Sequence, residues 1–152
     1  DSLVETEARP ELAFLAGVAK RETVLIVEGK RILVVDDMEL NVRLLEEALT
    51  LQGAHVVTAL CAEDGLELAR QTQPDLILMD LQMPRMDGLT ATRRLKADPQ
   101  TADIPVVAVT AAAMEEDRER AFAAGCEGFL AKPVDVNALP GQLAAVLAKR
   151  RQ

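Results

Sequence analysis

Five short apolar runs, each followed by a stretch with helical periodicity, are the feature that most limits the fold of this chain. The runs are Ile32-Leu33-Val34-Val35, Val56-Val57-Thr58, Leu76-Ile77-Leu78-Met79, Val106-Val107-Ala108-Val109 and Gly128-Phe129-Leu130. Continuous rather than alternating runs predict strands buried on both faces, as in a parallel sheet. Five strand-then-helix units predict an α/β fold, a doubly wound parallel sheet with helices on both faces, because right-handed crossovers leave almost no other topology.

The stretches between the runs carry helix signals. We expect helices over residues 39–51, 62–71, 89–97, 115–124 and about 137–149. In the first of them, the pattern places on one buried face Leu44, Leu45, Ala48 and Leu49. Gly125 predicts the end of the fourth helix, and Pro140 is compatible only with the first turn of the last.

Residues 1–29 lie outside the alternation of strand and helix signals. We therefore expect an N-terminal extension or linker there and a single domain over residues 30–152. A short helix over residues 10–20, a strand over 23–27 and a turn at Glu28-Gly29 are expected. An extra edge element, an interaction arm and part of a preceding linker remain equal alternatives. The first residue is Asp1, which favours an excerpt of a longer polypeptide over a stand-alone protein.

Composition excludes several classes of protein. A net charge of −8 and a pI of about 4.7 argue against non-specific binding of nucleic acid, which needs a basic face. The sequence shows neither a membrane span nor a secretory signal, so we expect no membrane association and a cytoplasmic location. Cys61 and Cys126 lie far apart without ligand-like spacing, which predicts free, buried thiols in a reducing compartment.

Polar side chains follow four of the five predicted strands. Asp36-Asp37 follow the first, Asp80 ends the third, Thr110 ends the fourth, and Lys132-Pro133 come after the fifth. In open α/β sheets, ligands bind at the carboxyl ends of the strands, so these side chains are expected at one edge. Any one of them alone is ordinarily a turn former, a helix cap or a solvated charge. Their joint occurrence at one edge indicates a site.

The chemistry of this edge follows from the residue types. Three neighbouring carboxylates repel one another, and a divalent cation relieves the repulsion. Oxygen ligands without His or Cys select a hard ion, and we expect Mg²⁺, which leaves positions for phosphate oxygens. Lys132 adds a positive charge and Thr110 a hydroxyl donor, so the site suits a phosphoryl group. No Ser, Cys or His is placed to act as nucleophile, which leaves Asp80 as the expected covalent acceptor.

The chain from about residue 30 to 149 resembles the receiver domains of two-component response regulators. The resemblance rests on four motifs in order: "ILVVDD" (32–37), "DLILMDLQMPRMDG" (75–88), "IPVVAVTA" (104–111) and "AGCEGFLAKP" (124–133). It is nearest to bacterial stand-alone cell-cycle receivers and to receivers of hybrid histidine kinases. It implies a flavodoxin-like sheet with strand order 2-1-3-4-5.

The resemblance also implies a role for each matching residue. Asp80 is the phosphoacceptor, Lys132 pairs with it, and Thr110 is the switch hydroxyl. Mg²⁺ is held by Asp37, Asp80 and the backbone carbonyl of Gln82, with Asp36 acting through water. Phe129 stands at the switch aromatic, and the Lys132-Pro133 peptide is expected to be cis.

The implied function is transfer of a phosphoryl group from a histidine kinase or histidine phosphotransfer protein to Asp80. The product changes the surface formed by residues 115–124, 128–131 and the last helix, toward a downstream protein target; a homodimer is left open. Such a domain is no classical enzyme, and only Mg²⁺-dependent self-phosphorylation and autodephosphorylation are expected. A degenerate receiver that acts as a phosphorylation-independent docking module is the alternative. A phosphohydrolase would need an acid where Gln82 stands.

Overall fold

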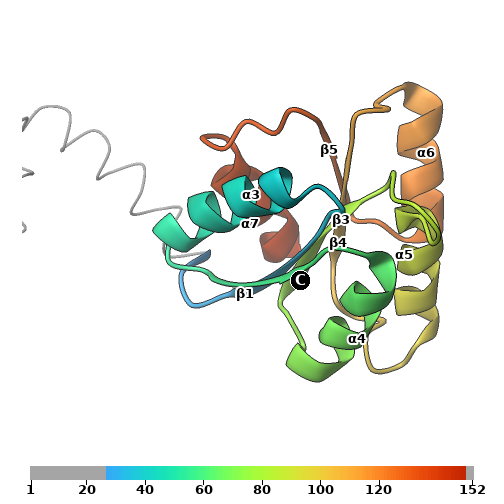
Figure 1. The fold of residues 1–152 in the computed structure, drawn as a ribbon, viewed down its shortest axis with the longest axis horizontal. Coiled ribbons are helices and arrows are strands. Elements are labelled where there is room, and N and C mark those ends of the chain that lie inside the picture. Colours follow the sequence, from blue (N-terminus) through green and yellow to red (C-terminus); the bar gives the residue numbers. More distant parts are fainter. Residues whose placement is uncertain (1–26, 150–152) are drawn as a thin grey trace, which may run out of the picture.

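The computed structural model describes residues 27–149, and within this range it shows one five-stranded sheet (Figure 1). The strands are β1 (Arg31–Val35), β2 (His55–Ala59), β3 (Leu76–Asp80), β4 (Val106–Thr110) and β5 (Gly128–Ala131). Each neighbouring pair is parallel, and the order is β2-β1-β3-β4-β5. The predicted doubly wound sheet and its strand order are confirmed.

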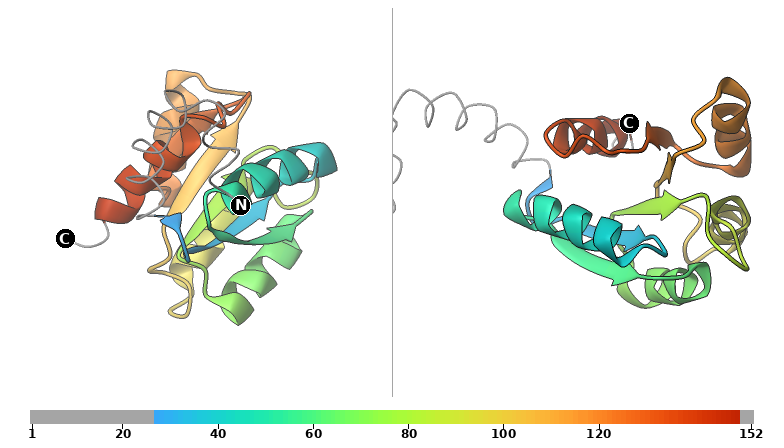
Figure 2. Two further views of the ribbon diagram at one scale, coloured as in Figure 1. Left: turned by 90° about the vertical axis from the view of Figure 1, so that its left-hand side faces the viewer. Right: turned by 45° about the horizontal axis from the view of Figure 1, so that its top comes forward.

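Helices cover both faces of the sheet (Figures 1 and 2). They are α3 (Glu39–Leu51), α4 (Ala62–Thr72), α5 (Gly88–Ala97), α6 (Glu115–Ala124) and α7 (Leu139–Lys149). On one face, α3 and α7 pack against Ile32 and Val34 of β1. On the other, α4, α5 and α6 pack in the cluster that includes Leu33 and Val35. Successive residues of β1 thus enter different hydrophobic layers, which explains its unbroken apolar run.

Burial on both faces, which the apolar runs predicted for every strand, is found only in the middle of the sheet. β1 is buried except at its first residue, and β3 and β4 are buried throughout. The prediction is wrong for β2 and β5, whose residues are mostly half-buried or exposed. Both are edge strands, so each lacks a neighbour on one side.

The buried face of α3 differs from the predicted one. Val42, Leu45 and Leu49 are buried, whereas Leu44 is 52% exposed. Each residue advances about 100° around a helix, so Leu44 is turned away from the line that Leu45 and Leu49 form. Leu40, which precedes it by one turn, is also exposed, and α3 therefore presents leucine to solvent.

Two predicted helix boundaries are confirmed. α6 ends at Gly125, which has a φ of 113° and is the expected C-cap glycine. Pro140 is the second residue of α7 and therefore lies in its first turn. The predicted helix over residues 10–20 lies outside the described residues. So does the strand over 23–27, apart from Val27, which is buried and does not belong to a strand.

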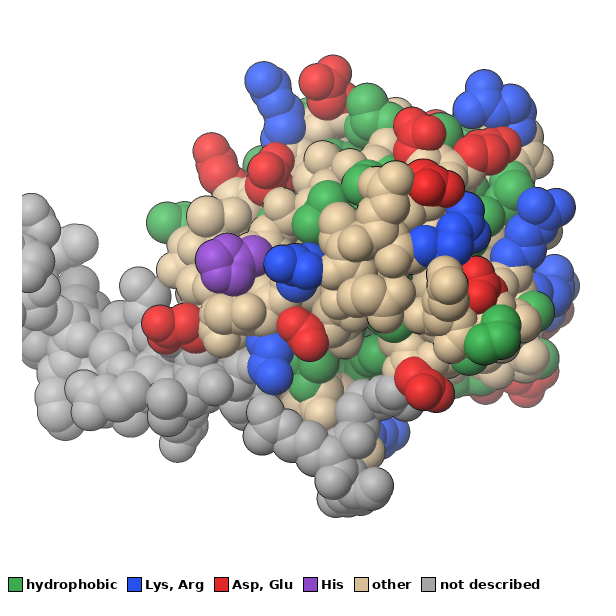
Figure 3. Space-filling model, turned by 90° about the horizontal axis from the view of Figure 1, so that it is seen from below, with side chains coloured by type: hydrophobic (Ala, Val, Ile, Leu, Met, Phe, Trp, Pro, Cys, Tyr) green, Lys and Arg blue, Asp and Glu red, His purple; other side chains and the backbone are tan. Residues whose placement is uncertain are grey.

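The described residues include both cysteines. Both cysteines are free, as predicted, but only Cys126 is buried; Cys61 is half-buried. Among residues 27–149, no helix is both long and apolar enough to cross a membrane. On the face drawn in Figure 3, acidic side chains lie among the basic ones.

Candidate functional site

The strand ends bring the predicted site residues to one edge of the sheet. Asp80 is the last residue of β3, and Thr110 is the last residue of β4. Asp36 follows the end of β1, and Lys132 follows the end of β5. The strands are in register, with Val35 opposite Met79, Asp80 opposite Val109, and Thr110 opposite Ala131 at their carboxyl ends. Four chain segments therefore converge on one small volume.

The three aspartates form an acidic cluster. One carboxylate oxygen from each of Asp36, Asp37 and Asp80 lies within 4.8 Å of the others. Asp36 and Asp80 are buried, whereas Asp37 is exposed. Two buried carboxylates at this separation are costly unless a cation accompanies them.

Lys132, which follows β5, supplies positive charge to this cluster. Its Nζ lies 3.1 Å from Asp36 Oδ2 and 3.4 Å from Asp80 Oδ1. Burial alone would lower the pKa of Lys132, but the hydrogen bond to Asp36 and the charges of Asp80 and Asp36 outweigh burial. Its pKa therefore lies above the ordinary value, and the ammonium stays charged.

The fold disfavours the charged form of Asp80. Burial raises the pKa of Asp80 to about 6, and the charge of Asp36 adds to the rise. The Gln82 N–H, which donates to Asp80 Oδ1 at 3.1 Å, and the charge of Lys132 oppose it. At neutral pH the side chain is thus an anion of unusually high basicity, which suits a nucleophile.

Thr110, Phe129 and Pro133 frame the site. Thr110 is buried, and its Oγ1 accepts a hydrogen bond from the Ala112 N–H at 3.0 Å. Phe129 lies in β5, half-buried against the hydrophobic cluster beneath α4, α5 and α6. The Lys132-Pro133 peptide bond is cis, the geometry that the resemblance implies.

The loop between β3 and α5 closes against the backbone of the acidic edge. The Gly88 N–H donates to the Leu81 carbonyl at 3.2 Å, and Asp87 caps α5 by accepting from the Thr90 N–H. A Cβ at Gly88 would lie only 2.3 Å from the carbonyl oxygen of Asp80. Only glycine therefore lets the first turn of α5 approach the acceptor strand so closely.

One polar contact of the site was not predicted from the sequence. Asn41 in α3 donates from Nδ2 to Asp36 Oδ2 at 3.4 Å. The sequence feature that could have indicated Asn41 is its position in the first turn of the helix that follows Asp36-Asp37. Because Asn41 lies neither on a strand nor directly after one, the pattern of polar residues at the strand ends did not indicate it.

Comparisons with known proteins identify the family of the chain. Residues 32–144 match the family model of the response regulator receiver domain. The chain is 50% identical over 105 residues to the response regulator PleD of Caulobacter vibrioides, covering 69% of this chain but only 23% of PleD. It is 42% identical over 107 residues to the polar-differentiation response regulator DivK of Brucella ovis, covering 70% of this chain and 87% of DivK.

Solved structures show the same fold. The receiver domain of the sensor histidine kinase PA1611 from Pseudomonas aeruginosa, solved with a magnesium ion in its active-site cleft, is 32% identical. Its TM-score is 0.73, and the match covers 79% of this chain and 98% of that one. The chemotaxis protein CheY4 of Vibrio cholerae is 26% identical, with a TM-score of 0.75 over 78% of this chain and 98% of its own. Family model, relatives and fold coincide, and the chain belongs to the response regulator receiver domains of two-component systems.

Proposed function

We propose that this domain accepts a phosphoryl group on Asp80 from a phosphohistidine of a histidine kinase or a histidine phosphotransfer protein. The observation that carries the proposal is the position of Lys132, which contacts the buried carboxylates of both Asp36 and Asp80 at the carboxyl edge of the sheet. An ammonium beside an acidic cluster suits a group that brings negative charge to Asp80.

In the proposed step, a carboxylate oxygen of Asp80 attacks the phosphorus of the donor. The bond between phosphorus and the imidazole nitrogen breaks, and its electron pair stays on the imidazole, which takes up a proton from solvent. The Lys132 ammonium then shifts from the Asp80 carboxylate to the new phosphoryl oxygens and pairs with them. Thr110 follows Val109, the residue of β4 that lies opposite Asp80. Its hydroxyl donates to another of the phosphoryl oxygens.

The residues present fit a magnesium ion, because the cluster offers only oxygen ligands. Asp37, Asp80 and the backbone carbonyl of Gln82 would hold the ion directly, and Asp36 would act through water. When bound, the ion would neutralise charge that develops on the transferred group.

Phosphorylation would be read at the surface formed by α6, β5 and α7. Thr110 pairs with Ala131 of β5, and Phe129 lies two residues before Ala131. A shift of the Thr110 hydroxyl toward the phosphoryl group would free space for Phe129 to turn inward. The modification would bias a two-state equilibrium by as much as it favours one state over the other. Phe122 of α6 is 40% exposed and lies under the Arg118 guanidinium, so α6 offers an aromatic side chain to a target protein.

Mass spectrometry of the intact protein after incubation with acetyl phosphate tests the proposal. With Mg²⁺ we expect the mass of one added phosphoryl group, and we expect none without Mg²⁺ or in Asp80→Asn. Asp64→Asn, which removes an exposed carboxylate of α4, serves as the matched control and should be modified like the parent protein.

Beryllofluoride, which mimics a phosphoryl group, separates rapid hydrolysis from inactivity. Binding of beryllofluoride without a detectable phosphoryl adduct would indicate fast loss of phosphate. Failure of both would favour the phosphorylation-independent docking module. An adduct that persists in Asp80→Asn would place the acceptor elsewhere.

A further inference from the structure

We propose that Asn41 is a positioning residue that holds the Asp36 carboxylate in the orientation required for the metal ion. This inference rests on the proposed function, because it concerns the same acidic cluster. Asn41 touches none of the reacting groups, and it acts through Asp36.

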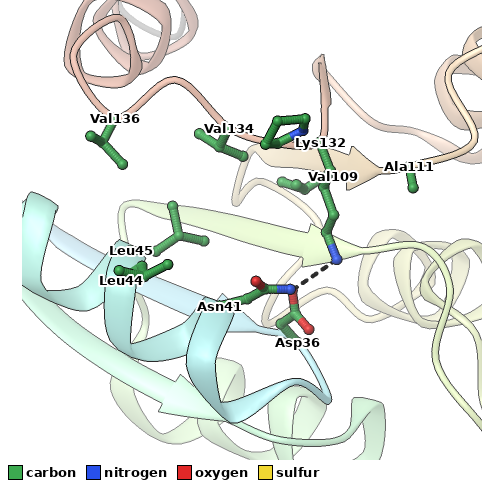
Figure 4. Close-up of a pocket in the computed structure, with 10 residues that line it drawn as sticks. Asp36, Asn41, Leu44, Leu45, Val109, Ala111, Lys132, Val134 and Val136 are labelled. Atoms are coloured by element: carbon green, nitrogen blue, oxygen red, sulfur yellow. Dashed lines mark hydrogen bonds and ion pairs between the residues drawn. The ribbon is translucent and has the colours of Figure 1, made fainter.

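The hydrogen bonds of Asp36 show why a third donor matters. Its Oδ1 accepts from the Met38 N–H at 2.8 Å, and its Oδ2 lies 3.1 Å from Lys132 Nζ. Asn41 Nδ2 approaches the same Oδ2 at 3.4 Å from the helix side (Figure 4). The carboxylate plane is fixed only while both of its oxygens have partners, and the backbone donor holds just one of them.

Lys132 is a poor permanent partner for Asp36. Its ammonium also contacts Asp80 at 3.4 Å, and it would move with the charge when Asp80 is phosphorylated. Asn41, by contrast, stands on a regular helix whose Val42 and Leu45 are buried against the sheet. Its amide therefore keeps Oδ2 engaged when the lysine turns toward Asp80.

Apart from its contact with Asp36, Asn41 lies beside apolar side chains, which give no reason for an amide at this position. It lines a cavity of about 380 Å³ together with the apolar side chains Leu44, Leu45 and Val134 (Figure 4). A leucine at this position would add to that apolar wall and remove the donor. Leucine thus separates the two roles: if the side chain merely fills space, leucine should be harmless to the metal site.

The test measures Mg²⁺ affinity by isothermal titration calorimetry, because the chain contains no Trp or Tyr to report binding by fluorescence. Asn41→Leu is expected to weaken Mg²⁺ binding about tenfold, the lower end of the effect of losing an outer-shell partner, because Asp36 would contact the ion through water. Its free energy of unfolding without metal should be unchanged or higher. Asn41→Gln, which keeps an amide donor on a longer stem, should recover part of the affinity. Thr50→Ala, an exposed neutral change on the same helix, is the control and should bind like the parent.

The outcomes distinguish this inference from the proposed function. Parent-like Mg²⁺ affinity in Asn41→Leu would overturn the positioning role and leave the acceptor role of Asp80 intact. Equal weakening in Asn41→Leu and Asn41→Gln, with lower metal-free stability in both, would show a merely structural role and also overturn it. A parent protein that neither binds Mg²⁺ nor gains a phosphoryl group would instead refute the proposed function.

Discussion

Asp80→Asn is expected to stabilise the metal-free protein by about 2 kcal/mol at about pH 7.5, although it removes the proposed acceptor. Burial first, and then the charge of Asp36, raises the pKa of Asp80 from 3.8 to about 6. The native state therefore disfavours the charged carboxylate relative to the unfolded chain. A shift of this size corresponds to about 3 kcal/mol at most, and a neutral amide should regain much of it.

The same shift predicts how stability depends on pH. Between about pH 4 and pH 6 the folded protein retains the Asp80 proton, whereas the unfolded chain has already released it. The contribution of Asp80 to the free energy of unfolding should therefore fall as the pH rises through this window and change little above it. Asp80→Asn should lack this part of the fall, so the stability difference between the two proteins should grow with pH.

Urea denaturation followed by far-ultraviolet circular dichroism, with a chelator present, measures both effects. The difference between parent and variant at about pH 4.5 and about pH 7.5, which bracket most of this window, isolates Asp80 from other titrating groups. Addition of Mg²⁺ should stabilise the parent and leave the variant nearly unchanged. A variant less stable than the parent at the higher pH would mean that the ion pair with Lys132 outweighs the burial of Asp80.

Gly88→Ala is expected to lower the free energy of unfolding by about 3 kcal/mol and to slow phosphorylation of Asp80. The added Cβ would lie 2.3 Å from the Asp80 carbonyl oxygen and 2.7 Å from the Leu81 Cα, both of them backbone atoms. The clash is relieved only by moving the acceptor strand or the first turn of α5. Movement of the strand would displace the Asp80 carboxylate from Lys132 and slow phosphorylation, whereas movement of the helix turn alone would lower stability without displacing the carboxylate.

Gly141→Ala is the matched control for this substitution. Gly141 lies in α7, and a Cβ there would meet nothing within 4 Å. Because alanine favours a helix more than glycine does, we expect this variant to be more stable by up to about 1 kcal/mol. Urea denaturation and the acetyl phosphate assay report on both variants. Parent-like stability in Gly88→Ala would show that the loop yields without disturbing the acceptor.

The central strands and the strand-end residues were predictable because both follow from a local pattern. A strand buried on both faces must be apolar at every position, and a parallel sheet gathers all its carboxyl ends at one edge. Edge strands and helix faces were less predictable. Burial of β2 and β5 depends on which strands lie beside them, and exposure of Leu44 depends on the rotation of α3 against the sheet.

The contacts of Asn41 and Gly88 with the site were unpredictable from the sequence for a different reason. Each contacts the site across a turn or from the start of a helix, at a distance set by how closely that helix approaches the sheet. The sequence motif that contains Gly88 indicates a loop after the acceptor, but it does not show that the backbone of Asp80 occupies the space of a side chain at Gly88.

The double contact of Lys132 would make the proposed metal binding at this edge an exchange of cations. The lysine already partly neutralises Asp36 and Asp80, so an arriving divalent ion gains only the excess of its attraction over that of the ammonium. Such competition favours modest affinity and rapid release. Occupancy would then follow the free ion concentration around the protein, and a donor would meet sites in both forms.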